Sequence, residues 1–241
     1  MEKAYKLLAL QEGISNQKAK ELIDRGLISS GGKKVLIARG LHDPAAKFKI
    51  QKLQKPCIIE ETEDFLAIEK PPFTTSEEIV ALFPEWILLH RLDKETSGVL
   101  LLTKEGDVHN RAKSEFKNER VYKEYIALIE GVFAQECEIT KPILTLKGKS
   151  AKSKISKDGS RASSKVEPIA TEGKRSLVRV IIKTGKTHQI RLHLSSIGHP
   201  IIGDSLYGSK VNAARVMLHA TKIALMGHEF TSEPPREFRV V

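Results

Sequence analysis

The sequence predicts an α+β protein in which a small basic α/β module precedes a larger domain built on a largely antiparallel mixed sheet. A length of 241 residues suits one large domain with a small module. Strand-like apolar runs alternate with short helical stretches and turns, without the regular βαβ spacing of a parallel sheet. The charge balance also changes sign near residue 55, which indicates a boundary there.

The charges are segregated along the chain. The formal net charge of +10 divides into an excess of +7 over residues 1–55, −9 over residues 56–140 and +12 over residues 141–241. Such an excess favours an anionic partner, either nucleic acid or an anionic membrane.

Hydropathy and cysteine content exclude several classes of protein. No 18 apolar residues follow one another, so no membrane span is expected and we predict a cytoplasmic protein. Cys57 and Cys137 stand 80 positions apart, which indicates neither a disulfide framework nor a thiolate zinc site. The hydrophobic fraction of 40% is sufficient for a globular core.

The first fifty residues predict a helix pair followed by a β-hairpin. Residues 5–10 provide an apolar helix face. A second helix is expected from an N-cap at Ser15 to a stop at Gly26, with apolar residues at helical spacing between them. Residues 27–35 then read as a strand, a Gly-Gly turn and a second strand.

This front segment resembles the alpha-L RNA-binding module of many ribosome-associated proteins, over roughly residues 3–50. It departs from that family at Asn16, where an arginine is usual. Backbone phosphate would then be bound by five basic residues, and the alternative is a solvated basic face without a ligand. These residues are Lys18, Lys20, Arg25, Lys33 and Lys34. The predicted boundaries are 1–52 for the module, 53–57 for a linker that contains a proline, and 58–241 for the second domain.

The second domain begins with a series of expected strands and one helix. The apolar run FLAI ends at a Pro-Pro pair, which cannot continue a central strand. Further strands are expected at 86–89, 99–102 and 121–131, and a helix at 106–118.

A cluster of charges, HRLDKETSG at 90–98, interrupts two apolar runs that would otherwise form one buried strand. Burying an isolated charge costs on the order of several kcal/mol unless the charge is paired. This loop is therefore expected to be either solvated or used. Residues 141–165 carry eight Lys/Arg and one acid, and read equally well as a solvated loop or as a surface that binds a polyanion.

A helix is expected after Thr187, which we interpret as its N-cap, with Gly198 and Pro200 as its stop. His188 and Arg191 should share the helix face opposite the core. The core face should contain Ile190, Leu194 and Ile197.

Four ordered blocks identify a family resemblance. HRLDKETSG, YKEYIAL, TGKTHQIRLHLSSIGHPIIGDSLYG and RVMLHA occur in the order and approximate spacing of RluA-like pseudouridine synthases. The resemblance implies the pseudouridine synthase fold, a mixed sheet with flanking helices around a central RNA-binding cleft. It also implies isomerisation of uridine to pseudouridine in RNA without metal or other cofactor. His188 and His193 are five residues apart, not the four that would place two ligands on one helix face, so a metal site is not expected there either.

The resemblance also implies roles for five residues. Asp93 matches the catalytic aspartate, and Arg191 the arginine that pairs with it, which as a bidentate partner would hold the carboxylate ionised. Tyr125 matches a tyrosine that packs against the target base. Leu218 resembles an apolar wall of the uracil pocket, and Arg91 an arginine that helps to extrude the target nucleotide.

One departure and several alternatives accompany this reading. Phe73 and Thr74 replace a glycine-containing block of the family, so the loop near the pocket is expected to differ in shape. A noncatalytic RNA-binding or ribosome-assembly factor is a second hypothesis. A nucleosidase-type hydrolase is a third, for which Glu95 would have to be the second acid. We expect a monomer acting on RNA, with large-subunit ribosomal RNA favoured over transfer RNA as the substrate.

Overall fold

The computed structural model describes residues 1–146 and 152–239, and the chain divides into two compact units. The first contains Met1–Gln54 and Asn212–Ala214, and the second Lys55–Val211 and Arg215–Val241. No helix in the described part of the chain is long and apolar enough to cross a membrane.

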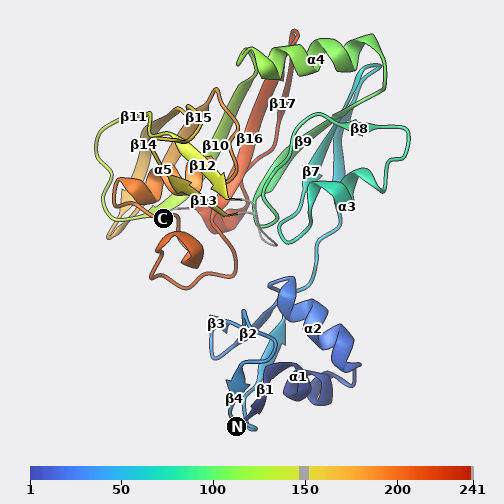
Figure 1. Cartoon of the computed structure of the whole chain (residues 1–241), viewed down its shortest axis with the longest axis vertical. Helices are drawn as coiled ribbons and strands as arrows, with labels where there is room; N and C mark the ends of the chain where they lie inside the picture. The colour runs from blue at the N-terminus through green and yellow to red at the C-terminus, as the bar shows by residue number, and fades with distance from the viewer. Residues whose placement is uncertain (147–151, 240–241) are drawn as a thin grey trace. The chain divides into compact units, whose positions relative to one another are not determined.

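The first unit combines two helices with short strands (Figure 1). Ser15 caps α2, because its hydroxyl accepts a hydrogen bond from the Lys18 amide at 3.1 Å. Gly31 and Gly32, both with positive φ, form the turn between β2 and β3. The elements are β1 (Glu2–Lys3), α1 (Ala4–Glu12), α2 (Asn16–Asp24), β2 (Ile28–Ser30), β3 (Lys33–Lys34), β4 (Leu41–His42) and β5 (Phe48–Ile50). Their apolar core consists of Ala4, Leu8, Ala9, Ala19, Ile23, Ile28, Val35 and Phe48. The helices and the hairpin thus form where periodicity and turn residues indicate them.

The second unit is built on a ten-stranded mixed sheet, whose main path runs β11-β14-β15-β10-β16-β9-β7-β6. β17 pairs with β16, and β8 pairs with β9. The strands are β6 (Cys57–Glu61), β7 (Phe65–Lys70), β8 (Ile87–Leu88), β9 (Ser97–Thr103), β10 (Tyr122–Glu130), β11 (Cys137–Ile139), β14 (Ser164–Glu172), β15 (Arg175–Ile182), β16 (Leu218–Leu225) and β17 (His228–Thr231). A separate hairpin joins β12 (Ile143–Leu146) to β13 (Lys152–Ile155).

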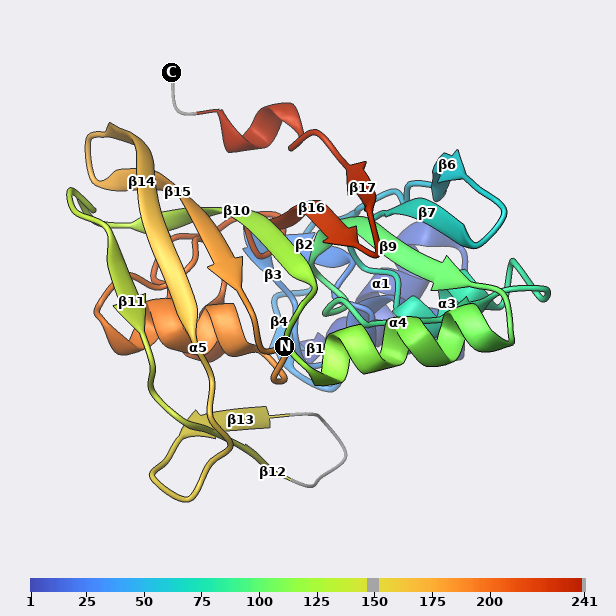
Figure 2. The ribbon, with the colours of Figure 1, turned by 90° about the horizontal axis from the view of Figure 1, so that it is seen from above.

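The helices of this unit are short. They are α3 (Ser76–Val80), α4 (Asp107–Lys117), α5 (Gln189–Ser196), and the 3₁₀ turns η1 (Ser205–Tyr207) and η2 (Arg236–Phe238). Figure 2 shows α4 and α5 on one side of the sheet and the segment with η2 on the other. The predicted α+β class with a largely antiparallel mixed sheet is confirmed.

A single parallel pairing joins the two halves of the sheet. Of the strand pairs in the described residues, only β9 and β16 run parallel, with Ser97 opposite His219 and Gly98 opposite Ala220. β9 is buried along its whole length, which explains the apolar run at 99–102 within it. The loop that precedes β9 therefore lies at the junction of the two halves.

The basic run at 141–165 lies partly outside the described residues. Its described part includes β12, β13 and the start of β14, and Ile143 and Ile155 pack with Ala162, Leu192 and Tyr207. The two paired strands thus contact α5 and η1 through apolar side chains.

Candidate active site

Asp93 lies in the loop between β8 and β9, where the sequence places its charge cluster. Its carbonyl oxygen accepts a hydrogen bond from the Thr96 amide at 3.0 Å, which closes the turn. Beside it, the buried hydroxyl of Ser76 accepts from the Leu92 amide at 3.1 Å and donates to the Leu92 carbonyl at 3.4 Å. The Asp93 side chain remains 24% exposed, so its carboxylate can meet a ligand.

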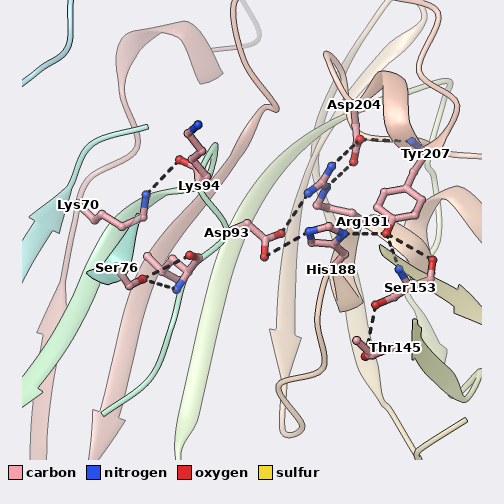
Figure 3. A network of polar contacts seen from close by, with 11 residues as sticks. Lys70, Ser76, Asp93, Lys94, Thr145, Ser153, His188, Arg191, Asp204 and Tyr207 are labelled. Atoms are coloured by element: carbon pink, nitrogen blue, oxygen red, sulfur yellow. Dashed lines mark hydrogen bonds and ion pairs between the residues drawn. The ribbon is translucent and has the colours of Figure 1, made fainter. Parts of the chain in front are cut away.

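A buried lysine, Lys70, donates a hydrogen bond to the backbone of this loop, a role that the sequence does not reveal. The Lys70 ammonium donates to the carbonyl oxygens of Pro71 at 3.0 Å and Thr74 at 2.7 Å. It also donates to the Lys94 carbonyl at 3.3 Å (Figure 3). Burial lowers the pKa of Lys70 to about 7. The signal in the sequence is a lysine that ends a buried strand directly before the Pro-Pro pair.

Arg191 contacts Asp93, but not in the predicted way. Its Nη1 lies 3.3 Å from Asp93 Oδ2. The bidentate pair is made instead with Asp204, through Nε at 2.7 Å and Nη2 at 2.8 Å. Burial opposes the charge of Arg191, whereas the hydrogen bonds to Asp204 and the charges of Asp204 and Asp93 raise its pKa. The prediction of a bidentate Asp93 pair was therefore wrong, because a fully buried carboxylate occupies the fork.

The start of α5 also differs from the prediction. The N-cap is His188, with φ of 56° in the left-handed region, and not Thr187. Residues Gln189 to Leu194 are all buried, so Arg191 is not on a solvent-exposed face, although it lies on the same side as His188, toward Asp93. Because most of α5 is buried, the pattern of apolar residues along it does not distinguish a core face from an exposed one.

His188 faces the carboxylate, although the sequence does not indicate a specific role for it. Its Nε2 lies 3.9 Å from Asp93 Oδ1, and its Nδ1 lies 2.7 Å from the Tyr207 hydroxyl. Burial lowers the pKa of His188, although the charge of Asp93 opposes this shift. The position of His188 within the TGKTHQIR block, three residues before Arg191, is the only sign of a functional role in the sequence.

One pocket brings together all five residues singled out in the second domain. Arg91, Asp93, Tyr125, Arg191 and Leu218 line a space of about 420 Å³ that is open to solvent. Among the described residues, Asp93 is the only carboxylate in its lining. Two-carboxylate glycoside chemistry thus lacks its second acid, since Glu95 does not line the pocket.

The remaining pocket residues supply an aromatic and apolar surface. Tyr125 on β10 and Leu218 on β16 are both buried. Burial and the charge of Asp93 raise the pKa of Tyr125, so its hydroxyl stays protonated. Arg91 is at the exposed rim, with a 73% exposed side chain and Nε 2.9 Å from Glu77 Oε1.

The basic residues of the first unit lie on two of its elements. Lys18 and Lys20 lie on α2, Arg25 is its C-cap, and Lys33 and Lys34 form β3. The Lys18 ammonium lies 3.1 Å from Glu21, and Arg25 lies 3.7 Å from the same carboxylate. The Lys20 ammonium lies 4.4 Å from the centre of the Tyr5 ring. Their role in binding RNA stays a prediction.

Comparisons with known proteins agree with this geometry. The family model described as RNA pseudouridylate synthase matches residues 64–196. An RNA pseudouridine synthase of Helicobacter pylori strain J99 is 52% identical over the full length of both chains. The dual-specificity RNA pseudouridine synthase RluA of Vibrio cholerae is 31% identical, covering 69% of this chain and 75% of that protein.

Two further matches concern the fold and a ribosomal enzyme. The solved structure of human RNA pseudouridylate synthase domain containing 1 superposes with a TM-score of 0.64 at 25% identity, covering 74% of this chain and 83% of that one. The ribosomal large subunit pseudouridine synthase C of Buchnera aphidicola is 36% identical over 56% of this chain and 47% of that protein.

The four sequence blocks, the sheet and the matched relatives agree on one family. The family model spans more than half of the chain and includes both the Asp93 loop and Arg191. The chain therefore belongs to the RNA pseudouridylate synthase family, with RluA among its relatives, and is an RNA pseudouridine synthase, an isomerase.

Proposed function

We propose that the chain isomerises specific uridines with Asp93 as the catalytic carboxylate. The observation that carries this proposal is that Asp93 is the only carboxylate among the described residues lining the pocket, and that the Arg191 guanidinium lies 3.3 Å from it. In this reaction the bond from uracil N1 to the sugar breaks, the base turns, and carbon 5 bonds to the sugar instead. The carboxylate can act on the anomeric carbon, on carbon 6 of the base, or on a sugar proton, and each of these needs it ionised and held in place.

The pocket residues around Asp93 are suited to hold a detached base. Tyr125 offers a ring for stacking and Leu218 an apolar wall. A base released into open solvent would be lost, so a pocket bounded on one side by these two side chains supports recapture through carbon 5. Arg91, at the exposed rim, can fill the gap that an extruded nucleotide leaves in the RNA or bind the phosphate of that nucleotide.

A noncatalytic RNA-binding factor is the competing function. Such a factor would not need a carboxylate beside a buried arginine, because burying that ion pair costs desolvation free energy and adds nothing to RNA binding. The Asp93–Arg191 contact therefore favours catalysis.

The experiment replaces Asp93 with asparagine and follows tritium release from RNA labelled at carbon 5 of uridine. The new carbon–carbon bond expels that hydrogen, so release reports the complete reaction. We expect Asp93→Asn to lower the single-turnover rate by at least roughly 1,000-fold, as for other essential groups, with RNA affinity changed less than about threefold.

Glu95→Gln is the matched control, because it removes a carboxylate from the same loop that does not line the pocket. We expect a loss of less than about tenfold, much smaller than for Asp93→Asn, because Glu95 is half-buried and acts on Arg191 and His188 only through its charge. Full activity in Asp93→Asn, with or without a loss in Glu95→Gln, would refute the assignment.

For the substrate, we propose uridines of large-subunit ribosomal RNA. The name of the Buchnera relative supports this, as does the basic first unit, which offers phosphate ligands. Carbodiimide mapping of pseudouridine in total RNA from a deletion strain, with and without the Asp93→Asn gene, identifies the site. Loss of a pseudouridine in large-subunit RNA is expected, and loss confined to transfer RNA would overturn this choice.

A further inference from the structure

Three side chains in a row, those of Asp93, His188 and Tyr207, connect the pocket to the β12–β13 hairpin. Figure 3 shows Asp93, His188, Tyr207 and Ser153 in sequence. His188 Nε2 lies 3.9 Å from Asp93 Oδ1, and its Nδ1 lies 2.7 Å from the Tyr207 hydroxyl. That hydroxyl also lies 3.3 Å from the Ser153 amide nitrogen and 3.4 Å from its carbonyl oxygen. None of the roles proposed above uses His188 or Tyr207.

The backbone of His188 is held in an unfavourable conformation. Its φ of 56° lies in the left-handed region, which costs a residue with a Cβ about 1 kcal/mol or more. Glycine or asparagine would serve better there if the position only had to begin α5. The neighbouring Gln189 side chain organises the turn on its own, since its Oε1 accepts from the Thr184 hydroxyl at 2.8 Å and from the Lys186 amide at 3.1 Å. Such strain persists where the surrounding structure uses the side chain.

Tyr207 selects one tautomer of His188. Because burial keeps the His188 pKa low, the ring is neutral near pH 7 and carries one proton. The Tyr207 oxygen accepts from the Ser153 amide, and its own proton has a much closer acceptor in His188 Nδ1, at 2.7 Å, than in the Ser153 carbonyl, at 3.4 Å. With Nδ1 accepting, the proton resides on Nε2, which faces the carboxylate. The other tautomer would direct a lone pair at a negative charge.

We propose that His188, with its tautomer fixed by Tyr207, is a second positioning residue for Asp93. Arg191 holds Oδ2, and the His188 Nε2–H group holds Oδ1 from the other side. The separation of 3.9 Å closes to a hydrogen bond when RNA fills the pocket, as catalytic contacts commonly tighten in the substrate complex. This inference rests on the proposed role of Asp93.

The first test uses His188→Gly and Tyr207→Phe in the full chain. Glycine removes the imidazole and also relieves the left-handed strain, so stability should hold or rise while the single-turnover rate falls about 10- to 100-fold. Tyr207→Phe should lower the rate about tenfold, with the KM for RNA within twofold. Asn tolerates the left-handed region and can donate, so His188→Asn should recover part of the rate.

The matched control is Tyr122→Phe, which removes an exposed hydroxyl bonded to Glu124 at 2.7 Å on β10. It should leave the rate unchanged. Because Tyr207 acts through His188, the double variant His188→Gly/Tyr207→Phe should be no slower than His188→Gly alone. A wild-type rate in His188→Gly, or losses that multiply in the double variant, would overturn the proposal.

A second readout does not depend on activity. Long-range proton–nitrogen NMR of the wild-type chain should show His188 protonated on Nε2 at pH 7, and Tyr207→Phe should increase the Nδ1-protonated fraction. An Nδ1–H ring in the wild type, or a tautomer indifferent to Tyr207, would contradict the inference even if Asp93 proves essential. Should Asp93→Asn instead stay active while the NMR result holds, the proposed catalytic role fails and the tautomer assignment stands.

Discussion

Two buried lysines hold the loops that border the pocket. Lys70 donates to the Lys94 carbonyl in the Asp93 loop and to two carbonyls of the segment between β7 and α3. Lys123 donates to the carbonyls of Lys183 at 2.8 Å and Thr184 at 3.2 Å. Burial lowers the pKa of Lys123 to about 8. Each ammonium group therefore acts as a multivalent hydrogen-bond donor to a loop that has no regular secondary structure of its own.

The depressed pKa of Lys70 predicts a pH dependence of stability. Between about pH 7 and 10.5 the unfolded chain binds the Lys70 proton more tightly than the folded chain, so the free energy of unfolding rises with pH. We expect the difference between wild type and Lys70→Met, from urea unfolding, to grow by about 2 kcal/mol from pH 7 to pH 9. Lys174→Met, the same change at an exposed turn, should show no such growth. A flat difference for Lys70→Met would contradict the prediction.

At the residue scale, sequence motifs locate the proposed catalytic carboxylate but not the residues that hold it. Asp93 and Tyr125 are found because they lie within blocks that resemble a family. The fork between Arg191 and Asp204 is missed because pairing a buried arginine depends on which carboxylate reaches it, and spacing along the chain does not reveal that. Lys70 is missed for a related reason, since its acceptors are backbone carbonyls that any sequence provides.

At the element scale, apolar periodicity predicts most helices and strands, and fails where an element is buried all round. The Ser15 cap and the Gly31–Gly32 turn lie where they are expected, because the local sequence alone determines them. α5 is the exception. Its six consecutive buried residues include polar ones, so the pattern of apolar residues gives neither its cap nor the burial of Arg191. The spacing does place His188 and Arg191 on one side, since both lie against Asp93.

The parallel contact between β9 and β16 depends on Gly98. A Cβ there would lie 2.2 Å from the carbonyl oxygen of Ala220, and its φ is 114°. Gly98→Ala should therefore lower the free energy of unfolding by more than about 4 kcal/mol or prevent folding, an effect reserved for severe steric conflicts.

Gly106→Ala separates steric conflict from backbone strain. Gly106 also has a positive φ, 129°, but a Cβ there meets nothing within 4 Å. It should cost about 1–3 kcal/mol, the range for strain alone. Equal effects of the two substitutions in urea unfolding would show that the close approach of the strands does not matter.

At the scale of the whole molecule, basic residues are in excess in the first unit and again over residues 141–241 of the second unit. The segment between them, which contains Asp93 and α4, is acidic. Charge alone gives affinity for phosphate without selecting a base, so recognition of the target uridine is left to the pocket and its rim.

A salt titration tests the first unit as an RNA handle. If Lys18 and Lys33 each contact a phosphate, Lys18→Gln/Lys33→Gln should reduce the slope of log affinity against log salt by roughly 1.5. Lys113→Gln/Lys117→Gln removes the same charge from exposed positions of α4 and should change the slope by less than about 0.5, on the same scale. If both pairs act alike, only net charge matters and the module has no specific contact.

The single parallel junction also orders events during synthesis. Asp93 belongs to the half of the sheet made first, while Arg191, the Leu218 wall and β16 leave the ribosome much later. Until β16 has been made and has joined β9, the carboxylate has neither its arginine nor its apolar wall. If these residues have the roles proposed for them, a partly synthesised chain is inactive and the pocket is complete only when the two halves of the sheet close.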